Sequence, residues 1–84
     1  MKIGTTVKVK SAEMLRKLTN IGFKKSVTLK NGLIFHSSML GYAGQLGVIT
    51  KIVKPGDDNG LTSDSYKIGQ ADVYWNEELL VDLK

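Results

Sequence analysis

The chain of 84 residues has no cysteine and a single proline. Without cysteine it can build neither a disulfide framework nor a thiolate metal site, and a reducing compartment such as the cytoplasm fits best. No apolar run approaches the roughly 20 residues of a membrane span, and the first residues lack the apolar core of a signal peptide. We therefore expect one cytoplasmic domain, residues 1–84, without a membrane partner.

Groups for catalysis or metal binding are equally scarce. The one histidine, His36, has no cysteine or second histidine to share a zinc ion, and its two serine neighbours in sequence do not make a catalytic triad. The glycine pair in residues 41–44 lacks the Gly-Lys-Ser/Thr ending of a phosphate-binding loop. The Asp-Asp-Asn-Gly run in residues 57–60 places Pro55 at the first ligand position of a calcium loop, which rejects that motif. We expect no enzyme, no metal and no cofactor.

The charge is distributed unevenly along the chain. Residues 1–54 carry ten Lys and Arg against one acid, a charge of +9, and the remainder carries two Lys against seven acids, a charge of −5. The net charge is +4. The basic part suits nucleic acid, an acidic protein surface, or simply a well-solvated face.

The first half begins with a strand and a helix. Residues 5–10 alternate strictly, so that Val7 and Val9 face one side and Lys8 and Lys10 the other. A helix is expected over residues 12–20, with an N-terminal cap, one acid in its first turn and a short apolar stripe. Its cap, acid and stripe are Ser11, Glu13, and Met14, Leu15 and Leu18.

Glycines mark where this helix ends and where a hairpin turns. Gly22 is expected to close the helix, and Phe23 after it to anchor the chain. Asn31-Gly32 lies between two apolar runs, residues 27–29 and 33–35, which predicts a hairpin with a type I′ turn.

Three glycines three residues apart, Gly41, Gly44 and Gly47, precede a β-branched strand at residues 47–53. We interpret them as structural, because glycine allows positive φ and close approach of chains. Residues 39–42 are expected to form one helical turn, capped by one of the serines at 37 and 38 and ended by Gly44 in a left-handed conformation. The apolar pattern at positions 48, 49, 52 and 53 predicts a bulge near Thr50.

The second half predicts two strands, one helical turn and a last strand. Asn76 is expected to cap the turn, and Trp75 or Val73 to fill the core with Tyr74 on the opposite face. The expected order is a loop at residues 55–64, strands at 65–68 and 72–75, a helical turn at 77–79 and a strand at 81–83. Together these elements predict a mainly β, small five- or six-stranded barrel with a short helix after the first strand and a helical turn before the last.

The order of these motifs resembles an SH3-like barrel. Residues 41–48, with their three glycines, resemble the KOW motif of ribosomal proteins and transcription elongation factors. Over nearly the whole chain, the order of motifs is similar to that of small SH3-like proteins of bacteriophages and prophages, which are related in pattern to Mind bomb repeats. The motifs that carry this resemblance are Val7-Lys8-Val9, Met39 with Tyr42 and Gly44, residues 66–68 and residues 73–75. The resemblance implies a non-catalytic barrel and transfers no catalytic residue.

Aromatic and basic side chains are the candidate binding residues. An outward tyrosine beside lysines on a barrel strand is suited to grip a peptide or a single nucleic-acid strand, whereas ordinary core packing is the alternative. The candidates are Tyr42, Tyr66, Tyr74, Lys8, Lys10, Lys51 and Lys67.

Three hypotheses of function follow. The first is an adaptor or inhibitor, of phage or mobile-element origin, that binds a host or bacterial protein, with an anti-defence role as one form. The second is a KOW-like nucleic-acid-binding protein that uses the basic residues before Pro55. The third is a subunit of a larger assembly or a homodimer paired through a strand edge, in place of a monomer.

Overall fold

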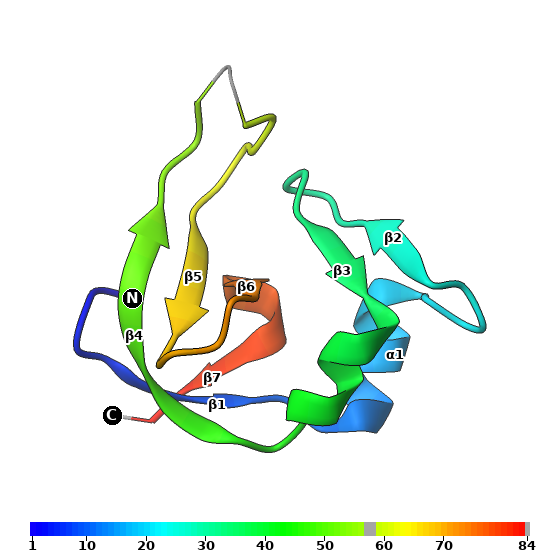
Figure 1. Ribbon diagram of the computed structural model, residues 1–84, viewed down its shortest axis with the longest axis horizontal. Coiled ribbons are helices and arrows are strands. Elements are labelled where there is room, and N and C mark those ends of the chain that lie inside the picture. Colours follow the sequence, from blue (N-terminus) through cyan, green and yellow to red (C-terminus); the bar gives the residue numbers. More distant parts are fainter. Residues whose placement is uncertain (57–58, 84) are drawn as a thin grey trace.

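The computed structural model of the chain describes residues 1–56 and 59–83, which form two antiparallel sheets (Figure 1). One sheet has five strands in the order β6-β5-β4-β1-β7, and the other is the hairpin β2-β3. Asp57 and Asp58, the two acids of the rejected calcium motif, lie outside the described residues. The strands are β1 Thr6–Val9, β2 Ser26–Thr28, β3 Ile34–His36, β4 Leu46–Val53, β5 Ser65–Ile68, β6 Tyr74–Asn76 and β7 Leu80–Asp82, with helix α1 Ala12–Thr19 and 3-10 helices η1 Ser37–Tyr42 and η2 Glu77–Leu79.

The expected mainly β class is confirmed, but the described strands do not close into a barrel. Among the strands that the structure describes, β6 and β7 are the outer strands of the five-stranded sheet, and neither pairs with the other or with the hairpin. The separate hairpin and α1 lie together on the right of Figure 1, beside the curved sheet. The five-stranded sheet therefore keeps two open edges.

Strand β4 bends where the apolar pattern predicts. The pairing between β4 and β5 shifts register between Ile49 and Lys51, which is the expected bulge at Thr50. The Thr50 hydroxyl donates to the carbonyl of Gly69 at 2.9 Å and so fixes the bend. Ile49 is fully buried and Ile52 packs against the core, so both point inward as predicted.

Helix α1 begins as expected and ends earlier. The Ser11 hydroxyl accepts the N–H of Met14 at 3.2 Å, which confirms it as the cap. The helix ends at Thr19, and the next residue, Asn20, takes the left-handed conformation with φ of 55° and donates its N–H to the carbonyl of Arg16. The expected closure by Gly22 is therefore wrong, because an asparagine tolerates the same backbone region two residues earlier.

The prediction that Phe23 anchors the chain after α1 is also wrong. Phe23 is fully exposed, whereas Ile21 is fully buried and fills the core position instead.

The hairpin forms at the predicted place with a different turn. Val27 pairs with Phe35, and beyond the strands Leu29 N donates to Leu33 O at 2.7 Å, which leaves residues 30–32 as the loop. The N–H of Gly32 donates to Leu29 O at 2.9 Å, and Gly32 alone takes a positive φ, 91°. The turn is therefore not type I′, which needs positive φ at both central residues; Asn31 has no positive φ, and its side chain is buried and bonded to Ser65 of β5.

The three glycines before β4 do not share one role. Gly44 has φ of 78°, as expected, and its N–H donates to the carbonyls of Val9 and Lys10. Gly47 has no positive φ, but a Cβ atom there would collide with the side chain of Ile68. Gly41 shows neither feature, so its structural role is not supported. Neither serine at 37 and 38 precedes the helical turn as a cap, because η1 begins at residue 37 itself.

The core joins both sheets around Trp75. This residue is buried as predicted, and the other fully or nearly buried apolar residues come from β1, α1, β3, η1, β4, β5 and the C-terminal elements. The Asn76 side chain accepts the N–H of Leu79 at 3.2 Å, which confirms it as the cap of η2.

Candidate functional site

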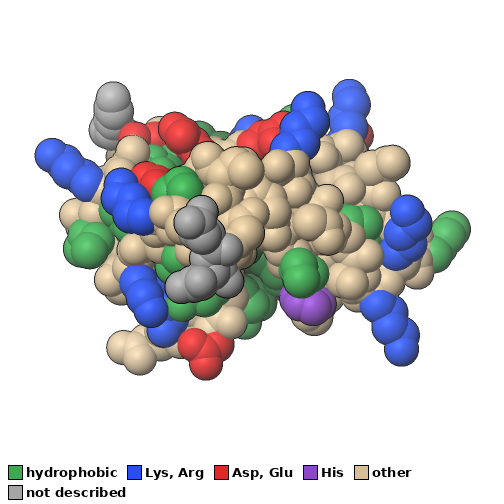
Figure 2. All heavy atoms as spheres, turned by 90° about the horizontal axis from the view of Figure 1, so that it is seen from above, with side chains coloured by type: hydrophobic (Ala, Val, Ile, Leu, Met, Phe, Trp, Pro, Cys, Tyr) green, Lys and Arg blue, Asp and Glu red, His purple; other side chains and the backbone are tan. Residues whose placement is uncertain are grey.

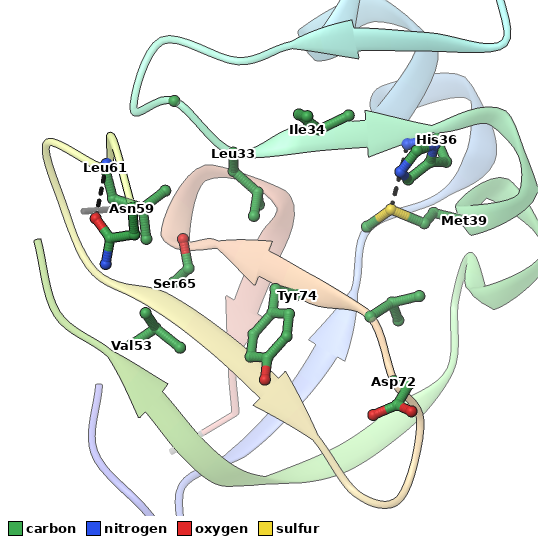
Figure 3. Close-up of a pocket in the computed structure, with 12 residues that line it drawn as sticks. Leu33, Ile34, His36, Met39, Val53, Asn59, Leu61, Ser65, Asp72 and Tyr74 are labelled. Atoms are coloured by element: carbon green, nitrogen blue, oxygen red, sulfur yellow. Dashed lines mark hydrogen bonds between the residues drawn. The ribbon is translucent and has the colours of Figure 1, made fainter.

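A groove of about 490 Å³ lies between β3 and the β4–β6 part of the larger sheet (Figure 3). In Figure 3, Leu33 from the hairpin and Ser65 from β5 point into the space between the two sheets. The lining is mainly apolar with a few polar groups, the usual character of a binding site. It consists of Gly32, Leu33, Ile34, His36, Met39, Val53, Asn59, Leu61, Ser65, Asp72, Val73 and Tyr74.

One wall of the groove is the open edge of β3. Just before β3, Leu33 O accepts from Leu29 N at 2.7 Å, and just after it Ser37 N donates to Lys25 O at 2.8 Å, so the odd-numbered positions of this segment bond toward β2. Because backbone groups of an antiparallel strand alternate in direction, those of Ile34 and His36 face away from β2. The N–H of His36 meets the Met39 sulfur at 3.4 Å, a weak acceptor. Among the described residues, the backbone N–H and C=O of Ile34 have no hydrogen-bond partner. The side chain of Ile34 is 51% exposed.

The opposite wall belongs to β6 and its neighbours. β6 is itself an outer strand, and from it the groove lining extends across the face of the larger sheet to Ser65 of β5 and Val53 of β4. Val53 pairs with Ser65, and Ser65 pairs with Asn76, on the same face. Val53, Leu61, Val73 and Tyr74 are half-buried and supply apolar contact area.

The loop that carries Leu61 is held by Asn59. Its side-chain oxygen accepts the N–H groups of Gly56 at 3.1 Å and Leu61 at 3.0 Å, and its side-chain nitrogen donates to the carbonyl of Lys54 at 2.9 Å. These three bonds fold the chain back on itself. Asn59 therefore positions Leu61 at the groove.

The tip of the hairpin is fixed to the larger sheet by Asn31. Its side-chain nitrogen donates to the Ser65 hydroxyl at 3.2 Å, its side-chain oxygen accepts the N–H of Leu33 at 3.2 Å, and its carbonyl accepts the N–H of Thr62 at 2.9 Å. A Cβ atom on Gly32 would collide with the carbonyl of Gly60. This close contact ends the groove and fixes the position of β3 relative to β5.

Three of the predicted binding residues come together. Lys51 pairs with Lys67, and Lys67 pairs with Tyr74, so the three form one row across β4, β5 and β6. Tyr74 also lines the groove. The Lys67 ammonium lies 3.4 Å from a carboxylate oxygen of Asp72, whose side chain is almost fully exposed.

The other predicted residues lie elsewhere. Tyr66 is 3% exposed and belongs to the core, and Tyr42 is half-buried with its ring edge-on to Trp75 at 6.1 Å. Lys8 lies on the outer face of β1, between Leu46 and Val81 of the neighbouring strands. Lys10, just beyond β1, is half-buried. None of the four lines the groove.

Sequence reasoning did not single out Leu33, Ile34, Val53, Asn59 or Leu61. The available signal was indirect: Ile34 is the outward residue of a strand that has only one predicted partner strand. Which edge of that strand stays open depends on how the hairpin packs against the larger sheet, and local sequence does not predict this packing.

Burial raises the pKa of Tyr66 above its ordinary value of 10.0. The carboxylates of Asp64 and Glu77 raise this pKa further, and the Lys54 ammonium lowers it. Lys54 and Asp64 also form an ion pair at 2.9 Å beside the loop. The phenol of Tyr66 is therefore neutral in the folded chain at physiological pH.

Within residues 1–56 and 59–83, no three His, Cys, Asp or Glu side chains are grouped so that they could hold a metal ion. In the same part of the chain, no helix has the length and apolar character needed to cross a membrane. None of the family models, curated proteins and solved structures compared with the chain matches it.

Proposed function

We propose that the chain is a non-catalytic binding module that takes an extended segment of a partner protein into the groove between β3 and β6. The observation that carries the proposal is the open edge of β3, where the backbone of Ile34 faces an apolar groove without a hydrogen-bond partner among the described residues. An added strand would satisfy this edge through its main chain, and its alternate side chains would contact Leu33, Val53 and Leu61.

The strand order supports an SH3-like architecture for this module. The helix and hairpin are inserted after β1, β4 bends at a bulge, and a 3-10 turn precedes the last strand. An adaptor or inhibitor of a host protein, of phage or mobile-element origin and cytoplasmic, remains the biological form that we propose. The basic chain and its resemblance to phage proteins support this form.

Paired substitutions on the two edges of the hairpin test the proposal. Peptides are selected from a displayed random library, and their affinity is measured by fluorescence anisotropy. Ile34→Pro removes an N–H that faces the groove, and Thr28→Pro is the matched control because its N–H faces away from β3. We expect Ile34→Pro to weaken binding about tenfold, the equivalent of about 1.4 kcal/mol, and Thr28→Pro to leave it unchanged. Equal effects, or no selected peptide, would reject the groove as the site.

Nucleic-acid binding is the second candidate. The row formed by Lys51, Lys67 and Tyr74 favours it, because two cations beside a tyrosine suit a phosphate backbone and a stacked base. The ion pair between Lys67 and Asp72 counts against it. A titration with single-stranded DNA at low salt decides: affinity that falls steeply with added salt and with Tyr74→Ala supports this function, and no affinity removes it.

A further inference from the structure

The turn after α1 presents a phenylalanine to solvent. Lys24 N donates to Ile21 O at 3.0 Å, and Gly22 inside this turn has φ of 55°. Ile21 is fully buried on one side of the turn, whereas Phe23 is fully exposed. A hydrogen-bonded turn with one buried anchor therefore holds the aromatic ring outward.

Cationic side chains surround this ring. A hollow of about 630 Å³ beside it is lined by Arg16, Lys24 and Lys25, together with Leu40 and Ser37. Neither of the two ion pairs in the described part of the chain involves these three cations. Figure 2 shows Lys and Arg side chains around a hydrophobic side chain at the right-hand end of the molecule, where Figure 1 has the loop between α1 and β2.

Local structure explains only part of this arrangement. Arg16 lies in the last turn of α1, where a cation is favourable because of the helix dipole. Lys24 and Lys25 lie beyond the helix, and the exposed position of Phe23 does not require an apolar side chain. Exposed aromatic residues together with arginine are typical of protein interfaces.

We propose that Phe23 and the surrounding cations Arg16, Lys24 and Lys25 form a second docking surface, for an acidic protein surface that has an apolar socket. The ring enters the socket, and carboxylates of the partner lie in the hollow beside the three cations. This charge complementarity speeds association and orients the partner. The surface shares no lining residue with the groove, so the inference stands independently of the proposed function.

A protein fits this surface better than the other anionic macromolecules. Sites for single-stranded nucleic acid stack successive bases on several aromatic rings, and this surface has one. Membrane-surface helices carry a continuous apolar face, but Met14 is the one exposed large apolar side chain among the described residues of α1.

The test uses two polymers as probes: a random copolymer of glutamate and tyrosine, and polyglutamate. Binding to the whole chain is measured by calorimetry. We expect the copolymer to bind about tenfold tighter than polyglutamate, and Phe23→Ser to remove this difference. The double variant Lys24→Glu, Lys25→Glu should lose affinity for both polymers.

The matched control uses a second exposed apolar residue beside a lysine. Leu46 is 66% exposed and pairs with Lys8 across the sheet. Leu46→Ser and Lys8→Glu should leave binding unchanged. Because Phe23 and both lysines are exposed, their variants should keep the circular dichroism of the original chain.

Three results would overturn the proposal. The first is unchanged copolymer binding by Phe23→Ser, and the second is an equal loss of binding in the control variants. The third is binding of oligothymidylate or of phosphatidylserine vesicles that depends on Phe23 and exceeds binding of the copolymer. The last result would assign the surface to nucleic acid or to a membrane instead.

Discussion

The ring of Phe35 in the hairpin meets the indole ring of Trp75 in the larger sheet edge to face, with centroids 6.3 Å apart and planes inclined at 64°. Both side chains are fully buried, and they come from the two strands whose edges border the candidate groove. The described strands of the two sheets do not pair with each other. This contact therefore stabilises the relative position of the two sheets that border the groove.

Removing this contact should destabilise the fold strongly. We expect Phe35→Ala to lower the free energy of unfolding by about 3–5 kcal/mol, because it leaves a cavity under the groove. Ile34 lies on the same strand but is half-exposed, so Ile34→Ala should change the free energy of unfolding by less than about 1 kcal/mol. Urea denaturation measures both values. Similar losses of unfolding free energy in the two variants would show that the contact between the rings does not hold the two sheets together.

The two glycines at positions 44 and 41 should respond differently to substitution. Gly44→Val forces a β-branched residue to φ of 78°, and we expect it to cost about 1–3 kcal/mol or more of folding free energy. Gly41→Ala is the control, since Gly41 has no positive φ and a Cβ there meets no atom within 4 Å. Thermal unfolding followed by circular dichroism compares them. If Gly44→Val were as stable as Gly41→Ala, the left-handed conformation would not be required.

Asn31 should control the rigidity of the groove. Asn31→Ala removes the bond to Ser65 and leaves the Leu33 N–H without its partner, so we expect a loss of about 1–3 kcal/mol. Amide hydrogen exchange at residues 32–36 should become faster, because the hairpin tip is released. Lys30→Ala, in the same turn but exposed, should change neither quantity. Unchanged exchange in Asn31→Ala would contradict this role.

Stability at alkaline pH should depend on Tyr66. Its pKa is raised above 10.0 in the folded chain by burial first and by nearby carboxylates second, whereas the unfolded chain ionises at the ordinary value. The contribution to stability is therefore full below the ordinary pKa and is lost as pH rises through the folded pKa. Tyr66→Phe should lose less unfolding free energy between about pH 9 and about pH 11 than the original chain. Parallel losses in the two proteins would refute this linkage.

Features that depend on near neighbours in sequence were predictable. The caps at Ser11 and Asn76 and the bulge at Thr50 follow from hydroxyl, amide and apolar groups within a few residues, and the structure confirms them. The turn at Asn31 is not the predicted type I′, and its side chain bonds to Ser65, a partner far away in sequence that local patterns do not reveal. The candidate site was predicted in part: Lys51, Lys67 and Tyr74 form one row, but the groove between two strand edges depends on pairings that local patterns do not specify.

By itself, the sequence determined the strand and helix order, the capped helix starts and the bent strand, because hydrogen bonds and apolar periodicity act over a few residues. The tertiary structure decided which apolar residues are buried and which strand edges stay open. Ile21 and Phe23 show the difference: both are large and apolar, but only Ile21 faces the core once α1 packs on the sheets. Burial depends on the direction in which the chain meets its distant neighbours, and the same packing leaves Phe23 and the edge of Ile34 available for partners.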